Sequence, residues 1–178
     1  MQIEIREPGS EAFYRETTNV LCQYRALRAK PDGKLHDKFR EMRTILILCA
    51  AALLILVALV VTDGWTAWRI VAAVLLAVDG VFYAYYLRGL YKTFKTLMDD
   101  HRTSVLTLDD AGVELNKENA QVVRASWENI AFARVFQESV CFFLKDGTGF
   151  VLSVSRRYEG ELLPYLRGRD DLALLEIE

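Results

Sequence analysis

Two apolar segments between residues 44 and 87 constrain this chain more than any other feature. From Ile45 to Val61 the sequence has no polar side chain, and Ile70 to Leu87 forms a second run of comparable length. At about 1.5 Å of rise per residue, a helix of either length approaches the roughly 30 Å hydrocarbon core of a bilayer. We therefore predict a transmembrane helical hairpin over residues 44–87, with spans at about 44–62 and 66–87.

Asp79 is the one ionisable residue deep in the second run. It costs about 2.5–3.5 kcal/mol near the bilayer centre, which roughly cancels the gain from the apolar residues around it. The tight turn at Asp63 and Gly64 would let the first span carry the second one in. Asp79 and Tyr83, one helical turn apart, are the candidate intramembrane contact. The alternative is that Asp79 is a packing or interfacial residue; a bond from its carboxyl to a tyrosine hydroxyl is one way to satisfy it.

Basic residues predict the orientation of the hairpin. They flank both ends of it, whereas the connecting loop holds Arg69 alone. By the positive-inside rule, both termini face the cytoplasm and the loop faces out, so the protein would be a two-span protein of the cell membrane. The flanking residues are Lys34, Lys38, Arg40, Arg43, Arg88, Lys92 and Lys95.

The N-terminal segment, residues 1–43, leads into the first span. The alternation from Gln2 to Arg6 predicts a short strand. A cytoplasmic amphipathic helix should follow from Ser10 and end before Pro31, and a second helix should resume at Leu35 and continue into the membrane.

Residues 88–178 change from helical period to period two. The second span should continue as a juxtamembrane helix that ends at Asp99 and Asp100. Six short strands and an amphipathic helix should follow, which is the order of an antiparallel pleckstrin-homology-like β-barrel with a closing helix, in an α+β membrane protein. The expected strands are 104–108, 113–116, 121–126, 130–136, 140–145 and 149–154, and the helix is 157–169.

Composition excludes several classes of function. Residues 99–178 hold 9 Lys/Arg against 15 Asp/Glu, which argues against a nucleic-acid partner. The three cysteines and two histidines are scattered without the spacing of a metal site. No nucleophile motif or phosphate-binding glycine loop occurs, so we predict no catalytic, cofactor or metal residue and a protein that is not an enzyme.

Three stretches of the C-terminal part resemble the YcxB-like membrane proteins. They are Leu106 to Val113, Ser126 to Ile130, and Phe142 through Arg156 and Arg157 to Leu166. The resemblance implies a cytoplasmic N-terminal segment, two membrane helices and a C-terminal pleckstrin-homology-like domain, with no established enzymatic activity. Trp127 lies in the second stretch, where a core residue that joins a strand to a turn is expected.

Arg156 and Arg157, with Lys145 expected nearby across a hairpin, are candidates for contact with an anionic lipid headgroup or a partner. The alternative is an ordinary solvated face. The predicted function is a membrane-anchored cytoplasmic interaction or regulatory module whose partners are membrane lipid and a protein or a second copy. Two other functions stay open: a toxin-immunity or membrane-stress factor that acts through the hairpin, and an accessory subunit of a membrane transport complex.

Overall fold

The computed structural model describes residues 1–5, 9–100, 104–117, 122–145 and 151–176. The chain divides into two compact units, residues 1–35 with 94–178 and residues 36–93. Two long apolar helices, antiparallel and mixed sheets and a further helix give the α+β layout that the sequence predicts. Residues 1–35 belong to the unit that holds the sheets, so the structure groups them differently from the N-terminal segment 1–43 drawn from the sequence.

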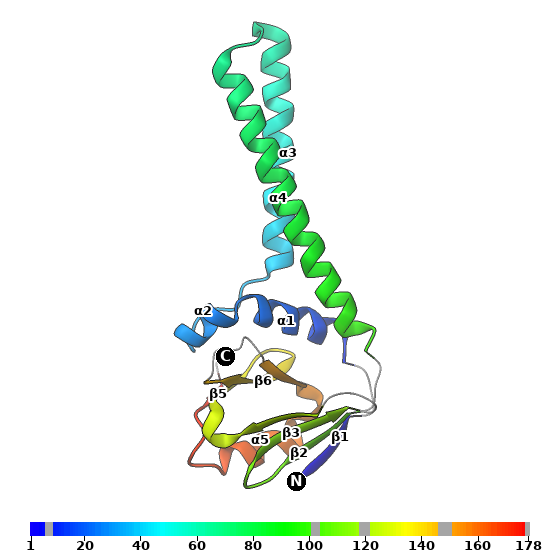
Figure 1. Cartoon of the computed structure of the whole chain (residues 1–178), viewed down its shortest axis with the longest axis vertical. Coiled ribbons are helices and arrows are strands. Elements are labelled where there is room, and N and C mark those ends of the chain that lie inside the picture. The colour runs from blue at the N-terminus through cyan, green and yellow to red at the C-terminus, as the bar shows by residue number, and fades with distance from the viewer. Residues whose placement is uncertain (6–8, 101–103, 118–121, 146–150, 177–178) are drawn as a thin grey trace. The chain divides into compact units, whose positions relative to one another are not determined.

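Residues 36–93 form an antiparallel pair of helices (Figure 1). Helix α3 spans Lys38–Asp63 and α4 spans Ala67–Met98, and both are long and apolar enough to cross a membrane. Helix α3 begins three residues later than predicted because Asp37 caps it, accepting hydrogen bonds from the amides of Phe39 (3.2 Å) and Arg40 (3.4 Å). Helix α4 ends before Asp99, as predicted.

Arg69 fastens the turn between α3 and α4. Its guanidinium is buried and donates to the carbonyl oxygens of Leu59 (2.9 Å) and Gly64 (2.6 Å), and it pairs with the Asp63 carboxylate at 3.0 Å. Gly64 has φ +80°, a conformation that glycine adopts without a steric penalty. Arg69 therefore ties the last turn of α3 to the turn that follows it.

Sheet A consists of four antiparallel strands in the order β1-β2-β3-β4. Strand β1 pairs with β2, with Ile3 opposite Leu106, although about a hundred residues separate them in sequence. The observed strands agree closely with those predicted, while Arg6 and Gln121, included in two of the predictions, lie outside the described residues. The bounds are β1 Gln2–Ile5, β2 Ser104–Leu108, β3 Gly112–Lys117 and β4 Val123–Ser126.

Sheet B has the order β7-β6-β5-β8. Three strands are antiparallel and match predicted ones, with Gly149 and Phe150 of the last prediction outside the described residues. The fourth strand, β8, pairs parallel to β5 and was not predicted, because three residues are too few for a periodic pattern. The bounds are β5 Ile130–Val135, β6 Ser139–Leu144, β7 Val151–Ser155 and β8 Leu174–Glu176.

The main core lies between the two sheets and helix α5 (Glu159–Arg167), which follows the short 3₁₀ turn Arg156–Tyr158. Leu106 of sheet A, Phe142 of sheet B and Leu162 of α5 are fully buried in it. Trp127 is buried there as predicted, and its Nε1 donates to the carbonyl oxygen of Asp109 at 2.7 Å. This bond joins the corner after β4 to the turn between β2 and β3.

A second core lies on the other face of sheet B, which helices α1 (Glu11–Cys22) and α2 (Tyr24–Ala29) cover (Figure 1). Tyr24 stacks on Phe143, with ring centroids 5.6 Å apart. Because both faces of β6 are covered, five of its six residues are buried and its sequence does not alternate. The two helices were predicted as one, but the amide of Gln23 is shared between the carbonyls of Asn19 and Val20 and the helix is interrupted there.

Candidate functional site

A groove of about 830 Å³ opens where β5 and β7 end beside helix α5. We call it the α5 groove. One wall is a face of α5 together with Arg156 of the 3₁₀ turn before it. The other wall is the end of β5, the turn after it and the end of β8. Its lining residues are Val135, Phe136, Gln137, Arg156, Glu159, Gly160, Leu163, Pro164, Arg167 and Glu176.

The lining residues of the α5 wall share one face of the helix. Residues 156, 159–160, 163–164 and 167 recur every three to four positions and so share one face, while Leu162 and Leu166 point into the core. Gly160 lies in the middle of this wall. A Cβ at its position would have no atom within 4 Å, so the absence of a side chain there leaves open space in the groove.

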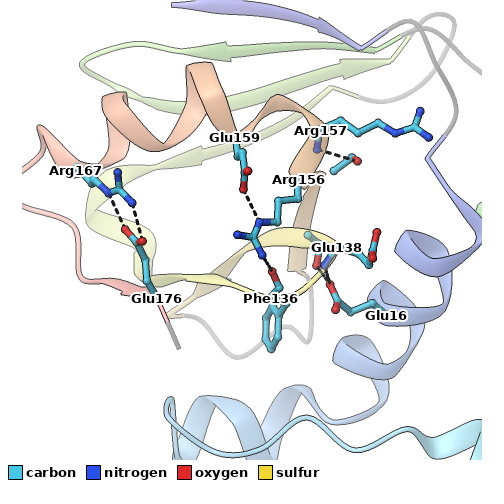
Figure 2. A network of polar contacts seen from close by, with 10 residues as sticks. Glu16, Phe136, Glu138, Arg156, Arg157, Glu159, Arg167 and Glu176 are labelled. Carbon is cyan, nitrogen blue, oxygen red and sulfur yellow. Dashed lines mark hydrogen bonds and ion pairs between the residues drawn. The ribbon is translucent and has the colours of Figure 1, made fainter. Parts of the chain in front are cut away.

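Two ion pairs lie along the groove (Figure 2). At one end Arg156 pairs with Glu159 and donates more weakly to the carbonyl oxygen of Phe136 at 3.5 Å. At the other end Arg167 binds Glu176 through two hydrogen bonds, of 2.8 and 2.7 Å. The hydrogen bond from Arg167 lowers the pKa of Glu176. The hydrogen bonds that Arg156 and Arg167 donate to their carboxylate partners raise the pKa of both arginines, so Glu176 and the two arginines are ionised near neutral pH.

Two further carboxylates come close to the Arg156 end. Glu16 of α1 accepts hydrogen bonds from the amide of Glu138 (3.0 Å) and from Ser139 Oγ (2.7 Å), and Figure 2 shows Glu16 and Glu138 beside Arg156. Burial raises the pKa of Glu16, while these hydrogen bonds oppose the shift. Arg156 therefore lies among three carboxylates, two of them outside the groove wall.

The structure separates the three residues predicted to form a basic site. Arg156 lines the groove, but Arg157 points away from it in Figure 2. The expectation that Lys145 lies near Arg156 is wrong. The register pairs Ser139 with Ser155 and Phe143 with Val151, so Arg156 follows one end of the β6–β7 hairpin and Lys145 the other, roughly 20 Å away at about 3.4 Å per residue.

Asp79 and Tyr83 lie one turn apart on α4. Asp79 is exposed, and Tyr83 is half-buried and packs edge-to-face against Phe82 with ring centroids 5.6 Å apart. Among the residues that the structure describes, Asp79 makes no hydrogen bond or ion pair, and so none to a tyrosine of its own chain. Its role as an intramembrane contact stays a prediction.

One of the four charged residues that line the groove, Arg156, was predicted from the sequence. Glu159 and Arg167 carried a usable signal, because they share helical spacing with Arg156 on the face opposite Leu162 and Leu166. Glu176 had none, since β8 was not predicted. Glu16 comes from a helix more than a hundred residues away in sequence, and local patterns do not report such proximity.

Comparisons with models of known families, with curated proteins and with solved structures find no match to this chain. Within the described ranges, no group of three or more His, Cys, Asp or Glu side chains is placed to hold a metal ion.

The groove has an apolar lining between two ion pairs. This arrangement is suited to recognition of a segment that has both apolar and charged side chains.

Proposed function

We propose that this protein is a membrane-anchored, non-enzymatic interaction module that binds a segment of a partner protein through the α5 groove. The observation that carries the proposal is the groove itself, which has an apolar lining between two ion pairs and open space at Gly160. Ligand sites in proteins commonly have this form, with an apolar lining and a few placed polar groups.

The anchor in this proposal is the pair α3–α4. Large apolar side chains along both helices are exposed, among them Leu54, Val61, Leu75 and Val81, and lipid would cover them. Trp65 and Trp68 are exposed near the turn, where an interfacial aromatic belt would lie. Basic residues flank the ends of the two helices away from the turn between them. The protein would therefore cross the cell membrane twice, with both termini in the cytoplasm.

We also propose that the sheet unit is pleckstrin-homology-like and that the chain is a YcxB-like membrane protein. Four antiparallel strands, then three, then a helix that packs on the core support this assignment. Here the first strand would be β1, separated from the second by α1, α2 and the apolar pair. Residues 1–35 would then complete the domain, which the C-terminal residues alone would lack.

The test is a crosslinking pull-down of the full-length chain from native membranes, with the wild type beside Gly160→Leu. Leucine should fill the groove without strain and favour the helix, since glycine costs about 1 kcal/mol relative to good helix formers. Glu161→Leu is the control, because Glu161 is an exposed α5 residue outside the groove wall. The proposal expects a partner that Gly160→Leu loses and Glu161→Leu keeps.

Asp79→Asn distinguishes the alternative functions. The Asp79 carboxyl is exposed on an apolar helix and has no partner among the described residues. Such a position would suit a contact with the membrane span of another protein. A partner that is lost in Asp79→Asn and kept in Gly160→Leu would contradict the groove proposal. Such a result would favour a toxin-immunity or membrane-stress factor that acts through the hairpin, or a subunit of a transport complex.

A further inference from the structure

We infer that the α5 groove takes a basic segment with an apolar anchor, of the kind that flanks the cytoplasmic end of a membrane span in another protein. This inference rests on the proposed function of the groove and adds the chemistry of its ligand. It is carried by the placement of the carboxylates around Arg156 and Arg167.

The charges at the groove favour a cation. Glu159 and Glu176 neutralise the two arginines of the wall. Glu16 and Glu138 then bring two more carboxyl groups next to the Arg156 end, where they act on the guanidinium through space. Complementary charge selects among partners and speeds their encounter, so this excess of carboxylates favours lysine or arginine over acidic side chains.

An anionic headgroup fits the same residues poorly. It would have to displace Glu159 from Arg156 or Glu176 from Arg167, and both carboxylates already occupy the guanidiniums. Lys145, which was predicted to belong to the basic site, lies at the far end of the β6–β7 hairpin. Headgroup recognition usually draws on clustered Lys and Arg residues, and the groove offers no such cluster among its lining residues.

The apolar lining between the two ion pairs selects an apolar side chain. Val135, Leu163 and Pro164 line the groove there, and the space at Gly160 admits a bulky group. Binding energy at interfaces is concentrated in such anchored aromatic or aliphatic side chains. Apolar residues beside Lys and Arg are characteristic of the cytoplasmic flanks of membrane helices, which a module anchored in the same bilayer meets at high effective concentration.

The experiment uses the full chain in neutral detergent micelles and three labelled hexapeptides, measured by fluorescence anisotropy. They are Lys-Lys-Leu-Phe-Lys-Arg, the neutral Gln-Gln-Leu-Phe-Gln-Gln and the acidic Glu-Glu-Leu-Phe-Glu-Asp. Phosphatidylglycerol vesicles test whether the groove binds an anionic lipid headgroup instead. We expect the basic peptide to bind at least about tenfold more tightly than the acidic one, and to weaken as salt rises.

Variants locate the binding. Gly160→Leu should weaken the basic peptide at least about tenfold, because it removes the space for the anchor. Glu159→Gln should weaken it about threefold, as expected for an exposed charge at the rim. Glu161→Gln removes the same charge from the same turn of α5 outside the groove wall, and should change the affinity little.

Three other results would show whether the ligand chemistry or the groove itself is wrong. Tighter binding of the acidic peptide that still depends on Gly160 would overturn the ligand chemistry and leave the groove as a binding site. Vesicles that bind and lose affinity in Arg156→Gln would replace the basic segment with a lipid headgroup. No peptide binding up to about 1 mM, or binding unchanged by Gly160→Leu, would overturn both the inference and the proposed function of the groove.

Discussion

Gly112 and Gly160 lie in opposite surroundings, and alanine at the two positions should have opposite effects. At Gly112 a Cβ would lie 2.2 Å from the carbonyl oxygen of Ala125 on β4, whereas at Gly160 it would meet nothing within 4 Å. Gly112→Ala should therefore lower the free energy of unfolding by about 1–3 kcal/mol, the usual cost of overpacking. Gly160→Ala should raise it by about 1 kcal/mol through helix propensity. Urea unfolding monitored by circular dichroism measures both, and equal effects would contradict the packing described here.

Cys141 should be an inert thiol in the folded protein. It is fully buried, its Sγ lies 3.4 Å from Ser139 Oγ and 3.3 Å from Ser153 Oγ, and burial raises its pKa to about 11. In a Cys22→Ser, Cys49→Ser variant, maleimide should label Cys141 at pH 8 only when denaturant unfolds the chain, because the thiolate is the reactive form. Wild-type Cys22, which is exposed, gives the positive control. Rapid labelling of Cys141 without denaturant would contradict its burial.

At the scale of elements, the turn between α3 and α4 depends on Arg69. Arg69→Gln should lower the stability of the helix pair by about 1.5–3 kcal/mol, because charged hydrogen bonds to Leu59 and Gly64 are lost. Resistance of helical content to SDS measures this. Arg88→Gln removes an exposed arginine from the same helix and should have little effect. An equal loss of stability in Arg69→Gln and Arg88→Gln would mean that the hydrogen bonds of Arg69 do not stabilise the helix pair.

The docking of α1 on sheet B should depend on pH through Glu16. Burial raises the pKa of its carboxyl above the ordinary 4.5, and the nearby Glu138 carboxyl adds to the rise. The hydrogen bonds from Ser139 and from the amide of Glu138 act in the opposite direction and lower the pKa. Between 4.5 and the raised value, the folded chain therefore binds more protons than the unfolded chain. The free energy of unfolding should fall as pH rises through this window and stay lower above it.

Glu16→Gln keeps an acceptor for both hydrogen bonds and cannot titrate. Thermal unfolding from pH 4 to 7 should show a stability difference, wild type minus variant, that decreases as pH rises. Glu11→Gln, at an exposed carboxylate of the same helix, should keep the wild-type slope. A wild-type slope retained in Glu16→Gln would show that another group is responsible.

Local signals in the sequence were sufficient for most elements. Period-two alternation between turn residues located β2 at Ser104–Leu108, and the spacing of Leu162, Leu163 and Leu166 located the closing helix. Caps and side-chain bonds shifted the boundaries, as Asp37 did for α3 and Gln23 for the N-terminal helix. These shifts come from a few local hydrogen bonds, which hydrophobic periodicity does not report.

At the scale of the whole molecule, the partners of distant segments were beyond the sequence. Nothing in Gln2–Ile5 indicates that it pairs with β2, or that α1 and α2 cover the outer face of sheet B. The groove has the same origin, since its charged residues come from α5, β8 and the residue after β7, with Glu16 of α1 beside them. Arg156 was predicted from the sequence but with the wrong neighbour, Lys145, because local patterns do not fix the register of the β6–β7 hairpin.

The most direct test of the account is site-specific photo-crosslinking of the full-length chain in intact cells. A benzophenone amino acid replaces Pro164 in the groove wall or, as the control, Glu161 outside it. The account predicts a discrete protein adduct from position 164 that is absent from position 161 and disappears when Gly160→Leu is added. The same adducts from both positions, or an adduct from 164 that persists with Gly160→Leu, would contradict the groove as the partner site.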